Sequence, residues 1–248
     1  MAVDLGLEVI SFITPALHPQ VVASLEDYDN DTEGELRQVV EAFEGAYAGV
    51  KRVHAAREAV EQDITLTQAA KVLATSDMAD KVLEGVTKRF DRAANNMKVG
   101  IALLERELSA PVEARAAHSI SVEIRAHMKA MPGLKALDFV RAAINRGDAV
   151  SASAVLAAPS YLSGIDPEAQ AVLLRMWHEK ANPTAGKRLR AMRQAAELLG
   201  NNAPLVFTAL AKVVGVYTDP KTKRKFTAAD LRKLKQTSTA AFAQLGAL

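Results

Sequence analysis

The sequence predicts an all-α protein: a long N-terminal helical hairpin or bundle, then a domain of shorter helices, with a possible small β-hairpin near residues 216–227. Three observations predict this fold. Apolar residues recur at steps of three and four over long stretches, which is the period of an amphipathic helix. Of the 248 residues, 46 are Ala, the residue with the highest helix propensity. Pro and Gly interrupt the second half at short intervals, which favours shorter helices there.

Residues 1–31 are expected to form an N-terminal arm. Residues 7–13 are rich in β-branched and aromatic side chains, so they could form a short strand or an extended strip. Pro15 and Pro19 indicate a turn, and the acidic stretch at residues 26–31 is typical of a loop.

Residues 32–131 are expected to form the long hairpin or bundle. Thr32 and Glu35 have the spacing of a capping box, which predicts the start of a helix of about 30 residues. A second helix is expected from about residue 65 to 108. A third is expected over residues 111–130, because Pro is tolerated in the first turn of a helix.

The first long helix carries an apolar face that we expect to pack against another helix or against a second copy of the chain. This predicted packing and oligomer face consists of Leu36, Val39, Val40, Phe43, Tyr47 and Val50.

Residues 132–215 are expected to form the domain of shorter helices. Asp148 is a candidate N-cap, and Asp166 is another because Pro167 follows it at the first helical position. The predicted helices cover residues 134–145, 148–157, 167–181, 185–199 and 202–214.

Residues 216–248 are expected to form a basic hairpin and a C-terminal helix. Asp219 and Pro220 belong to a stretch with turn chemistry, which lies between two short β-like pieces. Thr227 and Asp230 have capping-box spacing and predict a final helix that ends near Leu245.

The charges are sorted along the chain although the net charge is only +2. The first 50 residues hold ten acids and one base, whereas the last 48 hold eight bases and two acids. The two ends could neutralise each other, within the chain or between copies, or they could have different partners.

The C-terminal cations are the best candidates for binding, because clustered Lys and Arg attract phosphates or an acidic protein surface. A solvated face is the alternative interpretation, since the cluster matches no nucleic-acid-reading motif. The candidate residues are Lys221, Lys223, Arg224, Lys225, Arg232, Lys233 and Lys235.

The composition also narrows the chemistry that we expect. The absence of Cys excludes a disulfide framework, a thiolate metal site and a Cys nucleophile. The five His show no metal-ligand spacing, and no nucleophile elbow occurs. We therefore expect no catalytic site, metal, cofactor or small-molecule substrate. No apolar run approaches the roughly 18 residues of a membrane span, and no secretory signal is recognisable, so a cytoplasmic protein is expected.

One stretch of the chain resembles a known group of proteins. The segments EIRAH at 123–127, AAINRGD at 142–148 and AVLAAPSYLSGI at 154–165 carry the resemblance. The stretch, about residues 120–177, is similar to uncharacterised proteins encoded by tailed bacteriophages and prophages of proteobacteria. The resemblance implies a phage gene product from the region for virion structure and assembly, located in the host cytoplasm during assembly and in the virion.

Together these patterns predict a non-enzymatic structural or assembly protein of a phage particle. We expect it to act through helix packing and subunit contacts, as a homo-oligomer and with other virion proteins. A nucleic-acid-binding accessory protein, which would contact DNA through the basic C-terminal segment, is the alternative.

Overall fold

The structure is a computed structural model and describes residues 12–115 and 117–245. The fold is all-α, as predicted, with one small antiparallel sheet in this part of the chain. Its contacts divide the chain into two units, Met1–Met97 with Gln194–Leu248, and Lys98–Arg193. This division differs from the four predicted segments, because two long helices, Gln68–Glu107 (α3) and Pro183–Val214 (α9), each belong partly to both units.

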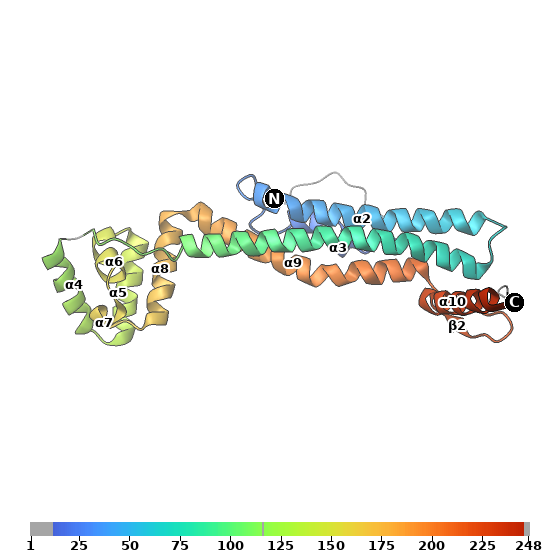
Figure 1. The fold of residues 1–248 in the computed structure, drawn as a ribbon. Coiled ribbons are helices and arrows are strands. Elements are labelled where there is room, and N and C mark those ends of the chain that lie inside the picture. The colour runs from blue at the N-terminus through green and yellow to red at the C-terminus, as the bar shows by residue number, and fades with distance from the viewer. Residues whose placement is uncertain (1–11, 116, 246–248) are drawn as a thin grey trace. The chain divides into compact units, whose positions relative to one another are not determined.

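The first unit is built around three long helices. Glu33–Gln62 (α2), the first three-quarters of α3 and the last two-thirds of α9 lie side by side (Figure 1). A short 3-10 helix, Pro15–Leu17 (η1), and a one-turn helix, Gln20–Ala23 (α1), come before α2 and contact it. Of the predicted strand at 7–13, residues 7–11 lie outside the described residues, and residues 12 and 13 form a turn and a bend.

The core of this bundle is formed by the apolar stripes of the three helices. The rings of Phe43 on α2 and Phe90 on α3 lie with their centroids 5.3 Å apart. Gly49 allows α2 to approach α3 closely, because a Cβ there would lie 2.6 Å from Cγ1 of Val82. A glycine that weakens an isolated helix is therefore required by the packing of this one.

The predicted capping box at the start of α2 does not form. Thr32 makes no side-chain cap; its buried hydroxyl instead donates to the carbonyl oxygen of Asp27 at 2.6 Å. The same hydroxyl accepts from the backbone N–H of Asp29 at 3.0 Å, so Thr32 orders the acidic loop that precedes the helix. A side chain that is buried against its own loop is not available to the orphan N–H groups of the helix.

The two helices predicted at 185–199 and 202–214 are one continuous helix, α9, with Pro204 inside it. The missing hydrogen bond and the clash at an internal Pro cost about 3 kcal/mol. Leu199, Val206 and Leu210 are buried on either side of it, and each such burial contributes about 1.5–3 kcal/mol. Packing of the long apolar stripe therefore outweighs the local preference for a break.

The second unit contains five shorter helices between the ends of α3 and α9. They are His118–Lys129 (α4), Gly133–Arg146 (α5), Ala149–Leu156 (α6), Ser160–Ser163 (α7) and Pro167–Ala181 (α8). They surround a core that includes Met128, Val140, Ile144, Val155 and Leu173. The predicted helix at 111–130 begins only at His118, because the backbone N–H of Arg115 donates to the hydroxyl of Ser153 rather than to a helix carbonyl.

The predicted caps and turns of the second unit are confirmed. Oδ1 of Asp148 accepts from the backbone N–H of Ser151 at 3.0 Å, and Asp166 accepts from the N–H groups of Glu168 and Ala169. Gly147, at φ +74°, ends α5 in the left-handed conformation that favours glycine.

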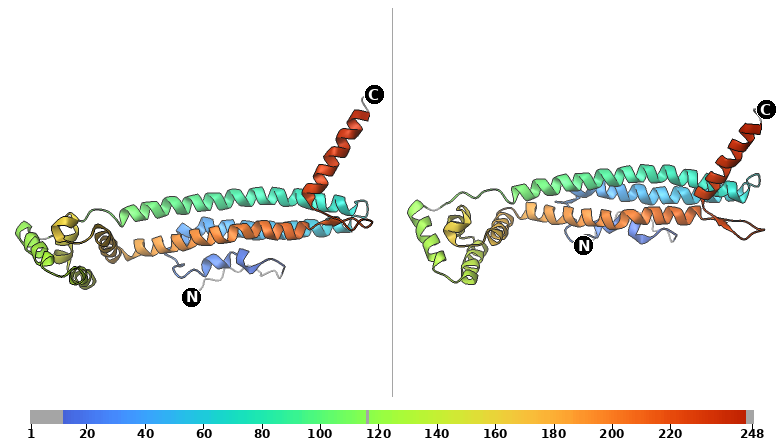
Figure 2. Two further views of the ribbon diagram at one scale, coloured as in Figure 1. Left: turned by 90° about the horizontal axis from the view of Figure 1, so that it is seen from below. Right: turned by 60° about the horizontal axis from the view of Figure 1, so that its bottom comes forward.

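The C-terminal segment has the predicted hairpin and final helix, and both belong to the first unit. Strands Tyr217–Thr218 (β1) and Lys225–Phe226 (β2) pair antiparallel, with Tyr217 opposite Phe226. Ala228–Leu245 (α10) follows, and its capping box forms, since Thr227 N–H donates to Oδ2 of Asp230 at 2.9 Å. Beyond its first turn α10 extends away from α3 and α9 (Figure 2).

Candidate interaction surfaces

Arg232 fastens the first turn of α10 to α3. Its Nη2 lies 2.6 Å from Oδ1 of Asp77, 2.6 Å from Oδ2 of Asp80 and 3.0 Å from Oγ of Ser76. These hydrogen bonds, with Asp77 first, raise the pKa of the Arg232 guanidinium. Arg232 was predicted as part of a basic contact surface, but its charge is already matched by two carboxylates of its own chain.

An apolar cluster next to this ion pair completes the attachment of α10. Val72 of α3 and Ala228 and Leu231 of α10 are buried against one another. Partly buried side chains that pack on them are Ala69, Leu73, Val214, Tyr217 and Phe226. The base of α10 is therefore fixed on the bundle by both apolar and polar contacts.

The turn between β1 and β2 and the first residue of β2 hold four exposed cations, Lys221, Lys223, Arg224 and Lys225, which we call the basic hairpin. Asp219 shapes the turn: its carboxylate accepts from the backbone N–H of Lys221 at 2.8 Å and from the hydroxyl of Thr222 at 2.9 Å. These bonds, the backbone one first, lower the pKa of Asp219. Asp219, the acid next to the cations, is therefore engaged in hydrogen bonds within the turn, and the four cations face solvent.

The seven predicted C-terminal cations thus fall into three groups. The basic hairpin holds four of them, and Arg224 lies 5.1 Å from the ring centroid of Phe226. Arg232 is occupied by α3. Lys233 and Lys235 are exposed on α10. Six of the seven cations are therefore exposed with no ion pair among the described residues.

The face predicted on α2 for packing or for oligomer contacts lies inside the chain. All six of its side chains, Leu36, Val39, Val40, Phe43, Tyr47 and Val50, are between 0% and 9% exposed. The helix-packing part of the prediction is therefore confirmed. The oligomer part stays a prediction, although these side chains are already buried within one chain.

The surface that sequence reasoning missed is the outer part of α10. Every residue from Lys233 to Leu245 is exposed, and Leu234, Phe242 and Leu245 are exposed by 54%, 73% and 68%. Leu231, Leu234, Ser238, Ala241 and Leu245 share one face at steps of three and four residues, and we call this set the α10 seam. Counting heptad positions onward from Leu231 would have identified it in the sequence.

The acidic start of α2 and the basic hairpin do not meet within the first unit. Glu33 lies at the start of α2, whereas the basic hairpin lies near Arg57, Thr67 and Gln68 at the other end of this helix. Because α2 has 30 residues, roughly 45 Å separates the two ends. Neutralisation within one chain, which the sequence left open, is therefore excluded for these groups.

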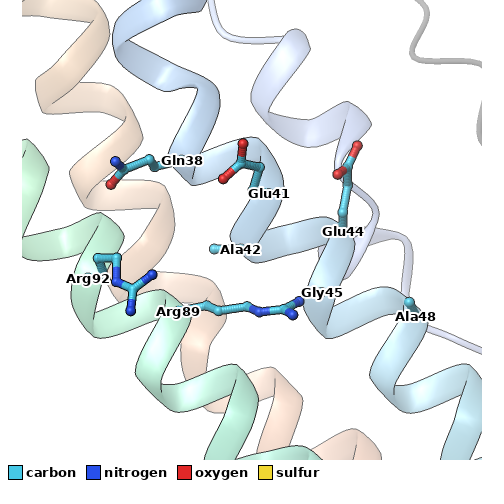
Figure 3. Close-up of a pocket in the computed structure, with 8 residues that line it drawn as sticks. All are labelled: Gln38, Glu41, Ala42, Glu44, Gly45, Ala48, Arg89 and Arg92. Carbon is cyan, nitrogen blue, oxygen red and sulfur yellow. The ribbon is translucent and has the colours of Figure 1, made fainter.

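A groove of about 520 Å³ between α2 and α3 is shown in Figure 3. Arg89 reaches across it toward Gly45, where a Cβ would lie 2.2 Å from Nη1 of Arg89. Glu41 and Glu44 lie along the α2 side of the groove and Arg92 lies on the α3 side. Charges of both signs therefore face the same groove, an arrangement that suits contact between the helices.

Two further findings concern the described part of the chain. No helix in it is both long and apolar enough to cross a membrane. No three or more His, Asp or Glu side chains among those residues come together as a metal ion would require.

No protein-family model, curated protein or solved structure matches the chain.

Proposed function

We propose that this chain is a non-enzymatic structural or assembly protein of a phage particle, which acts through helix packing and contacts between subunits. Its place would be the host cytoplasm during assembly and then the virion. The observation that carries the proposal is the outer part of α10, where Leu234, Ala241 and Leu245 of the α10 seam face solvent. Exposed apolar surface of this kind usually marks a protein contact.

The outer part of α10 has little stability of its own while it is uncovered. The exposed residues 233–245 span about 20 Å, and isolated helices of about this length are only marginally stable in water. Thr237, Ser238 and Thr239 are poor helix formers and weaken it further. Burial of the seam against another chain would supply the missing stabilisation.

The phage context is supported by the resemblance of residues 120–177. These residues lie within the second unit, in helices α4 to α8 with the loops between them. The part of the chain that resembles phage proteins is thus distinct from the part that carries the α10 seam. An assembly protein with a separate helical domain and a contact helix fits both features.

Mass spectrometry of purified phage particles and of assembly intermediates tests the proposal. We expect peptides of this chain in at least one of them, in several copies per particle. A phage that encodes Leu234→Ser with Leu245→Ser should yield fewer particles, whereas one with Leu103→Ser, a similarly exposed Leu on α3, should not. Absence of the chain from both particles and intermediates would contradict the proposal.

A second candidate function, nucleic-acid binding by an accessory protein, is favoured by the four exposed cations on one ordered turn. Such a cluster neutralises phosphates and releases counterions, so the affinity for DNA should fall steeply with salt. Replacement of Lys223, Arg224 and Lys225 by Ala should flatten that dependence by about one logarithmic unit of slope per lost contact.

Replacement of Lys51, Arg52 and Lys81 by Ala is the matched control, since it removes the same number of exposed Lys and Arg from α2 and α3. An equal loss of DNA affinity in both variants would indicate a general charge effect. Absence of binding by the wild-type chain at low salt would eliminate this candidate function.

A further inference from the structure

The α10 seam is continuous with a contact that the chain already makes. Leu231 is buried among Val72 and Ala228, and Leu234 follows it three residues later on the same face with 54% exposure. The seam residues occupy alternate a and d positions of two heptads, which is the pattern of a helix in a coiled coil. The bundle covers the first seam residue and leaves the others uncovered.

The geometry points to a second copy of this chain as the partner, with its α10 paired antiparallel against the seam. In antiparallel coiled coils an a position faces a d position of the other helix. One register places Leu234 opposite Leu245 of the partner subunit and Ser238 opposite Ala241 of the partner subunit. In this register the large side chains pair with each other at both ends, and the two small pairs lie at the centre. The seam is therefore complementary to itself.

Charge decides between the antiparallel and the parallel arrangement. The basic hairpin lies beside the start of α10, so parallel helices would bring two sets of four exposed cations together. In this register, antiparallel helices separate the two hairpins by roughly 35 Å, well beyond the Debye length of about 8 Å at physiological salt. They also bring Lys233 and Lys235 near the C-terminal end of the other helix, where the helix dipole favours cations.

The flank of the seam fits the same arrangement. Lys235 and Phe242 both occupy e positions, and e positions adjoin each other in antiparallel pairs. The ammonium group of Lys235 would then lie against the ring of Phe242 of the partner subunit, which is an attractive contact. The described part of α10 beyond Asp230 has no acid, so the ring of Phe242, and not a carboxylate, is the group on a second α10 that can attract Lys235.

This inference rests on the proposed function, because it identifies the partner of the α10 seam, the surface on which the proposed function depends. The complete absence of Cys from the chain allows a direct test. Full-length Ser238→Cys and Ala241→Cys chains are purified, mixed in equal amounts and oxidised, and intact mass identifies the linked species. We expect several-fold more disulfide-linked dimer in the mixture than with either variant alone, because a disulfide needs Cα atoms within about 7 Å.

Gln236→Cys mixed with Ala243→Cys is the matched control. These positions have the same axial offset in the proposed register but lie on the opposite face of α10, so they should not link. Efficient linkage of Ser238→Cys chains to one another would overturn the antiparallel pairing in favour of a parallel one. Equal linkage in the control would show that the disulfides report collisions, and would also overturn the inference.

The cross-linking experiment tests the pairing of α10, and mass spectrometry of particles tests the proposed function, so the two can fail separately. A wild-type chain that self-associates while the mixture of Ser238→Cys and Ala241→Cys chains does not link would overturn the pairing of α10 and leave the assembly function standing. A chain that is absent from particles and intermediates would contradict the function, whatever the cross-linking shows. Circular dichroism of each variant verifies that the substitutions leave the helix content unchanged.

Discussion

Asp148 shows, at the scale of a single residue, how one carboxylate sets the start of a helix. Its Oδ1 accepts the backbone N–H of Ser151 in the first turn of α6, and Gly147 just before it ends α5. The backbone bond from Ser151 is the largest cause of the lowered pKa of Asp148. The charged carboxylate is therefore favoured in the folded chain, and the cap contributes to stability.

Replacement of Asp148 by Ala should lower the free energy of unfolding of the second unit by about 1 kcal/mol, whereas Asn should retain most of the cap. The single Trp of the chain, Trp177, packs against the core that includes Val155 and Leu156 of α6. Urea unfolding followed by Trp fluorescence therefore reports on this unit. Equal losses in the Ala and Asn variants would contradict the capping role.

The pH dependence of this contribution has a defined sign. Because the pKa of Asp148 is lower in the folded chain than its usual value of 3.8, the stabilisation is fully present above about pH 4. It is lost as the pH falls through the folded pKa. The difference in stability between wild type and the Ala variant should therefore shrink in strong acid, as urea titrations at several pH values would show.

At the scale of elements, the approach of α2 to α3 depends on a glycine that local propensity would reject. A Cβ at position 49 would lie 2.6 Å from Val82, whereas a Cβ at Gly85 on the exposed face of α3 meets nothing within 4 Å. Gly49→Ala should destabilise the bundle by about 1–3 kcal/mol through overpacking. Gly85→Ala should stabilise it by up to about 1 kcal/mol through propensity. Thermal unfolding measured by circular dichroism distinguishes these signs, and stabilisation by both variants would contradict the close approach.

The attachment of α10 gives a second prediction for elements. Arg232→Met removes a guanidinium that binds Ser76, Asp77 and Asp80 but retains the aliphatic stem. Partly exposed ion pairs contribute about 0.2–1 kcal/mol each, so the loss of both should make amide hydrogen exchange in the first turn of α10 about two- to thirtyfold faster. Lys233→Met, on the same helix but without an ion pair among the described residues, is the control. Equal effects of the two substitutions would contradict the role of Arg232.

The elements that could be predicted from the sequence are those fixed by local chemistry. The stripe of α2, the caps at Asp148 and Asp166, and the hairpin with its following capping box all depend on neighbours within a few residues. The continuity of α9 through Pro204 could not be predicted, because it depends on side chains buried against distant helices. Thr32 was assigned to a helix cap, but it is buried against its own loop by tertiary packing.

The candidate surface was predicted only in part for the same reason. Clustered cations are visible in a sequence, but the carboxylates that occupy Arg232 lie more than 150 residues away from it. The apolar spacing on α2 and on α10 looks alike in the sequence. Only the fold shows that the first stripe is covered by the chain itself and that the second is not.

At the scale of the whole molecule, the acidic start of α2, the basic hairpin and the uncovered α10 seam all bear on how the chain meets other molecules. The acidic start of α2 and the basic hairpin cannot neutralise each other within one chain, and the outer part of α10 has no described neighbour. Both features leave surface available for contact with other chains. We therefore expect this protein to work as an assembled species.

Sedimentation velocity of the purified chain over a wide range of concentrations tests this claim most directly. We expect the mass to rise from the monomer value of 26.6 kDa toward at least twice that value. The Leu234→Ser, Leu245→Ser chain should remain at 26.6 kDa, while the Leu103→Ser chain should follow the wild type. A wild-type chain that stays monomeric at every concentration would contradict the account.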